Sequence, residues 1–375
     1  MKYYIISGEA SGDLHGSNLV KALRKKDPEA QIRAWGGDLM SEAGAGVVKH
    51  YRDLAFMGFA EVAANIRTIM RNFRECKEDI LEFTPDVLIL IDYPGFNLRM
   101  AEFGKNKGFK VFYYISPQIW AWKQNRVKKI KAYVDEMFVI LPFEKEFYAR
   151  FDVDAHFVGH PLIDAVETYQ QKLPDRDQFI SEWNLDERKI ALLMPGSRKQ
   201  EISRMLPLML QVADEFPEYQ FVVAGAPGQD ASYYKSFTEN RNVKVISGKT
   251  YELLNYADAA MVTSGTATLE AAIFGVPQVV CYKGGSLSYL IARSLVKVKY
   301  ISLVNLIMDR QVVKELIQTD LDAKSLAKEF RAIAVPGDRR NQMVTEYEEL
   351  YSKLGGRGAS EKTADLMLKK LQTSN

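Results

Sequence analysis

The 375-residue sequence has little of what marks disulfide-rich, metal-binding, membrane-spanning or nucleic-acid-binding proteins. Its only cysteines are Cys76 and Cys281, which form no metal-ligand cluster and indicate a reducing compartment such as the cytoplasm. No apolar run approaches the roughly 20 residues that a bilayer span needs, and the apolar run within Met1–Gly8 is too short for a signal peptide. A net charge of +2 argues against bulk nucleic-acid binding. These absences predict a globular protein that can touch a membrane but not cross one.

What the sequence does contain is two successive series of alternating strands and helices. The predicted strands of the first series are Tyr3–Ser7, Ile32–Trp35, Val87–Ile91, Val111–Ile115 and Met137–Leu141. Those of the second are Ile190–Met194, Phe221–Ala224, Val243–Ile246, Ala260–Thr263 and Gln278–Tyr282. This alternation predicts an α/β fold with two Rossmann-like domains facing across a cleft. The expected division is a first domain at 1–163, an interdomain segment at 164–188, a second domain at 189–340, and C-terminal helices at 341–375 that cross back to the first domain.

The first half is organised around five consecutive aliphatic residues, Val87–Ile91, that end on Asp92. So short a run predicts a strand covered on both faces, and Pro94-Gly95 then turn the chain. Ligands of open parallel sheets bind beyond the carboxyl ends of the strands, so Asp92 is expected to reach a substrate. A role in capping the following helix is the alternative that this stretch leaves open.

A turn of small residues, Gly8–Asp13, joins the first predicted strand to a helix. The order of strand, turn and helix is that of a phosphate-binding loop, but Gly8, Gly12 and Gly16 do not match the G-x-G-x-x-G fingerprint of dinucleotide sites. Small residues would let a ligand approach the helix N-terminus, where unpaired N–H groups favour anions. Tight packing of the helix on the strand is the alternative for each glycine.

Two turns of the second half also suit a phosphate. Gly196-Ser197-Arg198 follows a predicted strand, so its amides and its guanidinium could address one phosphate together. Ser264-Gly265-Thr266 follows another strand and opens a helix, and its N–H groups and hydroxyls suit a diphosphate. Glu270 lies about one helical turn further on, where its carboxylate can accept both hydroxyls of a ribose. Together these turns predict a nucleotide site, although Glu270 alone would more simply be a helix-surface residue.

Two stretches of the first half combine apolar with basic side chains. The first is a long predicted helix, about 59–83, with the nearly uncharged run 54–59 before it. The second is Trp120-Ala121-Trp122 followed by five basic residues with no acid among them. We expect both to contact a lipid surface, with arginine and lysine facing anionic head groups. The residues assigned to this contact are Phe56, Met57, Phe59, Arg67, Met70, Arg71, Arg74, Trp120 and Trp122. A core helix and a solvated helix face are the alternatives.

Five motifs make the chain resemble the lipid-A-disaccharide synthases, and they occur in the family's order over most of its length. They are Ser7–Asp13, Ile91–Asn97, Ser116–Trp122, Pro195–Arg198 and Ser264–Glu270. The first and third are specific to the family, whereas the last two occur in nucleotide-sugar transferases more widely. The resemblance implies a GT-B fold and a hexosyltransferase of lipid A biosynthesis. It implies transfer of 2,3-diacylglucosamine from UDP to 2,3-diacylglucosamine 1-phosphate, giving a β-1′,6-linked disaccharide 1-phosphate and UDP.

The resemblance also implies roles for individual residues. An inverting reaction needs a general base, which would be Asp92. The residues implied to bind substrate or UDP are Gly12, Asp13, Asn97, Gly196, Ser197, Arg198, Ser264, Gly265, Thr266, Glu270 and Asn305. No metal and no cofactor are implied. The chain departs from the family at Gly95, where an acid is frequent, and at Val304, where proline is common.

The partners implied are the two acylated sugars and the cytoplasmic face of the inner membrane, with no nucleic acid; the sequence leaves open whether the chain forms a homo-oligomer. The alternatives are another GT-B enzyme, such as the murein glycosyltransferase or a UDP-N-acetylglucosamine 2-epimerase, and a non-catalytic lipid-binding scaffold. Neither of the two enzymes would need the tryptophans and the basic run beside them.

Overall fold

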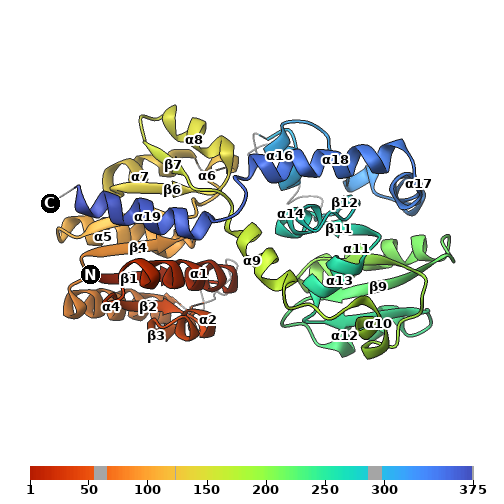
Figure 1. Ribbon diagram of the computed structural model, residues 1–375, viewed down its shortest axis with the longest axis horizontal. Helices are drawn as coiled ribbons and strands as arrows, with labels where there is room; N and C mark the ends of the chain where they lie inside the picture. The colour runs from red at the N-terminus through yellow and green to blue at the C-terminus, as the bar shows by residue number, and fades with distance from the viewer. Residues whose placement is uncertain (55–65, 123, 286–297, 374–375) are drawn as a thin grey trace. The chain divides into compact units, whose positions relative to one another are not determined.

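The computed structural model describes residues 1–54, 66–122, 124–285 and 298–373 (Figure 1). The chain divides into two compact units, Met1–Asp164 with Leu354–Asn375, and Ala165–Lys353. Each unit is built on one parallel sheet with helices, so the α/β class predicted from the alternation is confirmed.

The first unit has a seven-stranded sheet in the order β3-β2-β1-β4-β5-β6-β7, with all neighbours parallel. Its strands are β1 (Lys2–Ser7), β2 (Gln31–Gly36), β3 (Gly46–His50), β4 (Val87–Ile91), β5 (Lys110–Tyr114), β6 (Glu136–Val139) and β7 (Ala155–Phe157). Its helices are α1 (Ala10–Lys26), α2 (Asp38–Glu42), α4 (Ile66–Phe83), α5 (Pro94–Asn106), α6 (Ile119–Trp122), α7 (Val127–Tyr133), α8 (Pro142–Ala149) and α19 (Ala359–Gln372), with short 3-10 turns at η1 (Tyr51–Asp53) and η2 (Gln124–Arg126). The helix α9 (Pro161–Gln170) carries the chain from the first unit into the second.

The second unit has a six-stranded parallel sheet in the order β10-β9-β8-β11-β12-β13. Its strands are β8 (Lys189–Met194), β9 (Tyr219–Gly225), β10 (Val243–Ser247), β11 (Ala259–Thr263), β12 (Gln278–Tyr282) and β13 (Lys314–Ile317). Its helices are α10 (Arg176–Glu182), α11 (Lys199–Ala213), α12 (Ala231–Thr238), α13 (Thr250–Tyr256), α14 (Thr266–Ile273), α16 (Leu303–Met308), α17 (Ala323–Ala334) and α18 (Asp338–Lys353), with a 3-10 turn at η3 (Gln318–Asp320).

The central strands are buried on both faces, as their composition predicts. All five residues of β4 have no exposed surface, and the same holds for the middle residues of β8 and β11. A strand covered by helices on both faces needs no polar alternation, which is why these strands appear in the sequence as continuous aliphatic runs. The edge strands β3, β7 and β13 lack such a run, and the sequence did not predict them.

The strand order reverses once in each sheet, and these two places position the candidate sites. In the first sheet β1 and β4 are neighbours although two strands separate them in the sequence, and β8 and β11 are the same pair in the second sheet. The loops after two such strands leave in opposite directions and open a crevice at their carboxyl ends. The turns after β1 and β4 contain Gly8–Asp13 and Asp92, and those after β8 and β11 contain Gly196–Arg198 and Ser264–Thr266.

The C-terminal segment is divided between the units. The helix α19 packs on α1 of the first unit, and Figure 1 shows the two side by side. Ion pairs Lys25–Glu361 and Lys26–Asp365 join them, at 2.7 and 2.5 Å. The preceding helix α18 stays with the second unit, so the chain returns at Leu354 and not at residue 341.

Asp13 illustrates how the first unit uses a buried carboxylate to hold two of its helices. It lies on α1 and accepts N–H bonds from Gly37 (2.7 Å), Leu39 (3.1 Å) and Met40 (3.1 Å), at the N-terminus of α2. Its side chain caps a helix that is distant in sequence, where a negative charge also suits the helix dipole.

We expect Asp13→Ala to lower the free energy of unfolding by about 2–4 kcal/mol, because several buried N–H groups lose their acceptor. Urea unfolding followed by circular dichroism measures the change. Asp13→Asn keeps one amide oxygen as an acceptor and should lose less. Equal stability of the alanine variant and the wild type would contradict the capping role.

Candidate functional site

Asp92 lies directly after β4, in a strained turn of the first unit. Asp92 and Tyr93 both adopt left-handed backbone conformations, with φ of 45° and 48°. Two consecutive non-glycine residues in this region cost on the order of 1–3 kcal/mol each and persist only where the surroundings enforce them. The N–H of Asp92 donates to the carbonyl of Tyr114 (3.2 Å), and its carbonyl accepts from the hydroxyl of Tyr113 (2.6 Å). The neighbouring strand β5 thus holds the turn that presents the carboxyl group.

Asn97 fixes the same turn from the other side. Its side chain is fully buried, and its amide nitrogen donates to the carbonyls of Asp92 (2.8 Å), Ile91 (3.1 Å) and Ile6 (3.4 Å). The amide nitrogen of Asn97 is therefore bonded to the backbone ends of β1 and β4, whereas its amide oxygen has no partner among the described residues, so the substrate contact predicted for Asn97 stays a prediction. Asn97 positions Asp92. The departure at Gly95 leaves open space, since a β-carbon there would meet no described atom within 4 Å.

Glu9 is a site residue that the sequence reasoning missed. The pairing of Ser7 with Ile91 brings the turn after β1 beside the turn after β4, and a β-carbon at Gly8 would lie 2.4 Å from the ring of Tyr93. Glu9 precedes α1, and its exposed side chain makes no capping bond. The signal that could have found it is its place immediately after the strand that neighbours β4.

The carboxyl group of Asp92 is suited to proton transfer near neutral pH. Burial raises its pKa to about 6, and the negative charge of Glu9 acts in the same direction. A group with a pKa close to the working pH is both available in its basic form and strong enough to take a proton. The N-cap residue of α5 is Tyr93, which makes no side-chain capping bond. The catalytic role of Asp92 stays a prediction, and the raised pKa is the observation that supports it.

The two residues after β1 that were predicted to bind substrate, Gly12 and Asp13, make contacts within the first unit. Gly12 is buried against Ser7, and a β-carbon at Gly12 would lie 2.9 Å from that side chain. Asp13 is only 3% exposed, and its oxygens are occupied by the N–H groups of α2. These residues hold α1 against β1 and α2, and the substrate contacts predicted for Gly12 and Asp13 stay predictions.

In the second unit, the turn after β8 already binds an anionic group of the protein itself. The N–H groups of Ser197 (3.0 Å) and Arg198 (3.2 Å) donate to one carboxylate oxygen of Glu201. Gly196 has φ of 109°, and a β-carbon there would collide with Glu201 at 2.6 Å. Glu201 therefore competes for these amides, and the phosphate contact predicted for them stays a prediction. The guanidinium of Arg198 is 69% exposed and lies 3.7 Å from the other carboxylate oxygen of Glu201, so the same glutamate also pairs with this side chain.

The turn after β11 leaves a helix N-terminus open. Gly265 precedes α14 and has no side chain to cap it, and Gly265 and Thr266 are exposed. The hydroxyl of Ser264 donates to the carbonyl of Ile301 (2.9 Å) and anchors the turn to the segment before α16. First-turn N–H groups without intrahelical partners, together with the helix dipole, attract anions. The geometry thus suits the predicted diphosphate contact at Gly265 and Thr266.

Glu270 lies one turn further along α14 beside Tyr251, a residue that the sequence reasoning also missed. The hydroxyl of Tyr251 donates to Glu270 (3.3 Å), and burial raises the pKa of Glu270. Tyr251 is itself held by ring contacts to Tyr169 (5.3 Å) and Phe274 (5.4 Å). A carboxylate held this way can accept the two hydroxyls of a ribose, which matches the role predicted for Glu270.

Asn305 is part of the core of the second unit. It is fully buried in α16, and its amide oxygen accepts from the N–H groups of Val312 (2.8 Å) and Val313 (2.9 Å). Its amide nitrogen donates to Val313 and Glu315, both at 2.9 Å. With both side-chain atoms bonded within the protein, the predicted UDP contact of Asn305 is corrected to a structural role. Val304, the other departure from the family pattern, is fully buried beside it.

The predicted lipid-contact residues are only partly supported by their placement. Phe56, Met57 and Phe59 lie outside the described residues. On α4, Met70 is 56% exposed and its neighbour Ile66 51%, which is unusual for large apolar side chains. The basic residues Arg67, Arg71 and Arg74 are also exposed, whereas Phe73 of the same helix faces the core. The large apolar side chains of this helix thus divide into a buried part, Phe73, and an exposed part, Ile66 and Met70.

The lipid contact predicted for Trp120 does not fit the placement of its side chain. The indole of Trp120 is only 7% exposed and packs edge-on against Phe143, with ring centroids 5.0 Å apart. In the basic run that follows, Lys129 pairs with Glu102 (3.0 Å) and Lys131 with Asp152 (3.2 Å). Trp120 is a core residue of the first unit; of the placement of the Trp122 side chain nothing is described.

Two kinds of feature are absent from the described residues. No three His, Cys, Asp or Glu side chains in that part of the chain are grouped so that they could hold a metal ion. Among the helices described, none is both long and apolar enough to cross a bilayer.

Comparison with known proteins agrees with the motifs. A family model described as lipid-A-disaccharide synthetase matches residues 3–369. The lipid-A-disaccharide synthase of Syntrophus aciditrophicus is 41% identical over 379 residues, which cover 99% of this chain and 98% of that protein. That of Trichlorobacter lovleyi is 40% identical over 377 residues, covering 99% and 97%.

Among solved structures, a UDP-GlcNAc 2-epimerase of Methanocaldococcus jannaschii in complex with UDP-GlcNAc and UDP has a TM-score of 0.67 at 14% identity, covering 99% of this chain and 100% of that one. At so low an identity the likeness shows the fold alone, and this fold is shared by GT-B glycosyltransferases and epimerases. The agreement of the sequence matches over nearly the whole length decides the family: this chain belongs to the lipid-A-disaccharide synthases.

Proposed function

We propose that this chain is an inverting glycosyltransferase of lipid A biosynthesis. It transfers 2,3-diacylglucosamine from UDP to the 6-hydroxyl of 2,3-diacylglucosamine 1-phosphate and releases UDP. Membership of the lipid-A-disaccharide synthase family supports the reaction. The observation that carries the assignment of the base is the Asp92 carboxyl group, held at the strand-order reversal of the first sheet with its pKa raised to about 6.

In the proposed reaction, the oxygen of the acceptor hydroxyl forms a bond to C1 of the donor sugar while the bond from C1 to the diphosphate oxygen breaks. Asp92 takes the proton of the hydroxyl as the new bond forms, which raises the nucleophilicity of that oxygen. The electron pair of the broken bond leaves with UDP. Arg198 and the N-terminus of α14 stabilise the charge that develops on the leaving diphosphate, and Glu270 orients the nucleotide through its ribose.

We further propose that the protein acts at the cytoplasmic surface of the inner membrane, because its substrates carry acyl chains. The exposed Ile66 and Met70 of α4, with Arg67, Arg71 and Arg74 beside them, support this attachment. Apolar side chains at the interface together with arginines facing anionic head groups are the pattern of a peripheral helix. Sedimentation of the protein with lipid vesicles tests the attachment directly.

Replacing Asp92 by asparagine should abolish most turnover and leave the fold intact. Asparagine tolerates the left-handed backbone conformation of this position, so the turn should persist. Loss of a general base typically lowers the rate by about 10²–10⁴-fold. Release of UDP from the diacylated donor measures the rate, and the melting temperature serves as the control. Turnover within a few-fold of the wild type would remove Asp92 from the catalytic role.

The pH dependence should show the influence of Glu9 on the base. Asp92 must be deprotonated to accept a proton, so kcat/KM should fall as the pH drops below about 6, the value to which the pKa is raised. Glu9→Gln removes a negative charge and should move this acid limb to lower pH. Glu42→Gln, on an exposed carboxylate of α2, is the matched control. An acid limb that stays in place in Glu9→Gln would mean that burial alone sets the pKa.

Arg198→Ala and Glu270→Ala should each weaken UDP binding, the first through the diphosphate and the second through the ribose. Hydrogen bonds to charged groups predict a loss on the order of tenfold or more in Kd. Titration calorimetry with UDP measures the affinity. Arg204→Ala is the control, because it removes an exposed arginine of α11, the helix that follows Arg198. Unchanged affinity in both variants would place the nucleotide elsewhere.

A further inference from the structure

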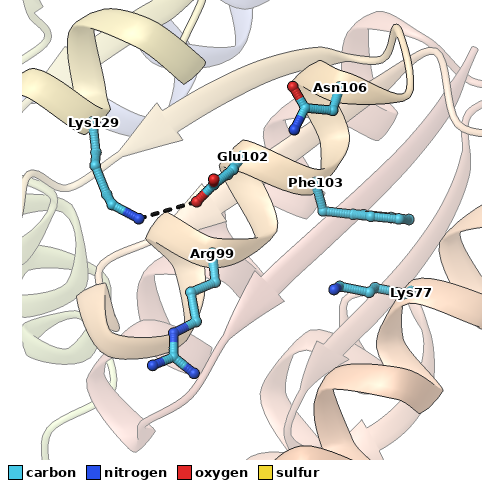
Figure 2. Close-up of a pocket in the computed structure, with 6 residues that line it drawn as sticks. All are labelled: Lys77, Arg99, Glu102, Phe103, Asn106 and Lys129. Carbon is cyan, nitrogen blue, oxygen red and sulfur yellow. Dashed lines mark hydrogen bonds and ion pairs between the residues drawn. The ribbon is translucent and has the colours of Figure 1, made fainter.

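A pocket of about 420 Å³ lies in the first unit, away from Asp92. It is lined by Lys77 of α4, by Arg99, Glu102, Phe103 and Asn106 of α5, and by Lys129 of α7 (Figure 2). Its volume is within the range of small-molecule sites. Arg99 lies five residues past Pro94 and Asn106 12 residues past it, which corresponds to about 8 and 18 Å along the helix from the end that follows Asp92. The proposed reaction therefore gives this pocket no role.

The pocket has an excess of positive charge. It contains three cations and one carboxylate, and that carboxylate is already used: Glu102 pairs with Lys129 at 3.0 Å, which lowers its pKa. Within the described ranges, no carboxylate forms an ion pair with Lys77 or Arg99, and both are partly or fully exposed to solvent. Lys77 also acts on Glu102 through its charge, but neither it nor Arg99 has an ion-pair partner among the described residues, and the excess of positive charge favours an anionic ligand.

Aromatic rings hold these two cations in place. The ammonium of Lys77 lies 5.3 Å from the ring centre of Phe103, and the guanidinium of Arg99 lies 5.1 Å from that of Phe73. Phe73 is in turn stacked on Phe96 at 4.4 Å. Figure 2 shows the Lys77 side chain reaching from α4 toward α5. A cation–π contact restrains the charged group but uses none of its N–H donors, which remain available to an anion.

The pocket residue Lys77 lies further along α4 than Ile66 and Met70, which form the exposed apolar end of that helix. A second hollow of about 440 Å³ is lined by Ile66, Arg67, Met70, Arg71 and Arg74. Lys77 follows Arg74 by three residues, so the row of basic side chains that Arg67, Arg71 and Arg74 form continues to the pocket. Met70 and Lys77 are seven residues apart, about 10 Å along the helix. Residues seven apart lie on the same face of a helix, so Lys77 is on the face that carries Met70, and its long side chain can bring the ammonium to the lipid phosphates when Ile66 and Met70 enter the interface.

We propose that this pocket binds the phosphate of an anionic phospholipid when α4 rests on the membrane surface. Lys77 and Arg99 donate hydrogen bonds to the phosphate oxygens, and the planar guanidinium of Arg99 suits two of them at once. The pair Glu102–Lys129 closes the other side of the pocket and adds no net charge. This inference rests on the proposed membrane attachment but not on the glycosyl transfer.

The test compares vesicle binding of two double variants that lose the same charge. Lys77→Gln with Arg99→Gln empties the pocket of its uncompensated cations, whereas Lys21→Gln with Lys145→Gln removes two exposed cations from α1 and α8. Each protein is sedimented with phosphatidylcholine vesicles that contain or lack phosphatidylglycerol. The pocket variant should bind the phosphatidylglycerol vesicles about tenfold to thirtyfold more weakly than the wild type, and the control variant less than about threefold more weakly.

Several outcomes would overturn the inference. Equal losses in both variants would mean that only net charge matters, and full binding by the pocket variant would mean that the pocket holds no lipid. Binding of inorganic phosphate by the wild type but not by the pocket variant, together with equal vesicle binding by both, would assign the pocket to a soluble phosphate. If the wild type also binds no vesicles, the proposed membrane attachment is wrong as well. Full binding by the pocket variant contradicts only the role of the pocket and leaves the proposed attachment in place. The melting temperature and the UDP affinity of each variant show whether it is folded. If the double variant unfolds, the single variant Arg99→Gln takes its place.

Discussion

The presentation of Asp92 depends on one buried amide. The side-chain nitrogen of Asn97 donates to carbonyls at the ends of β1 and β4, the two strands between which the order of the first sheet reverses. Without these bonds, two adjacent left-handed residues would relax toward ordinary backbone conformations, and the carboxyl group would change direction. The local burial that this arrangement requires also raises the pKa of Asp92. The position of the Asp92 carboxyl group and its raised pKa therefore have the same structural cause.

The sequence was sufficient for the parts that depend on local patterns. Continuous aliphatic runs identified the central strands, and because parallel strands end at one edge of a sheet, the same runs placed Asp92, Arg198 and the Ser264 turn at carboxyl edges. The edge strand β13 carries Lys314 and Glu315 at half of its positions and was missed. Pro94-Gly95 were expected only to turn the chain, but α5 begins at Pro94, because proline also suits the first turn of a helix.

The sequence could not distinguish polar residues that bind ligands from polar residues that bind the protein. Asp13 and Asn305 occur in or near the family's motifs, yet their partners lie at Gly37–Met40 and Val312–Glu315, which only the folded chain brings close. Burial decides between the two roles, and periodicity does not report the burial of a single polar side chain. The same reason explains Trp120, whose composition suggests a membrane interface but whose ring packs against Phe143.

Glu201 changes how the second unit can bind a diphosphate. With its carboxylate on the N–H groups of Ser197 and Arg198, a phosphate at that turn would have to displace a negative charge of the protein or share the site with it, and two anions on the same pair of donors repel each other. The N-terminus of α14 bears no such internal anion, since Gly265 lacks a side chain. The N-terminus of α14 is therefore the more favourable backbone partner for the proposed diphosphate, and Arg198, on the turn after the neighbouring strand β8, is its proposed side-chain partner. In this arrangement Glu201 stabilises the Arg198 turn in the absence of ligand, so the second unit does not need a bound nucleotide to hold its site in shape.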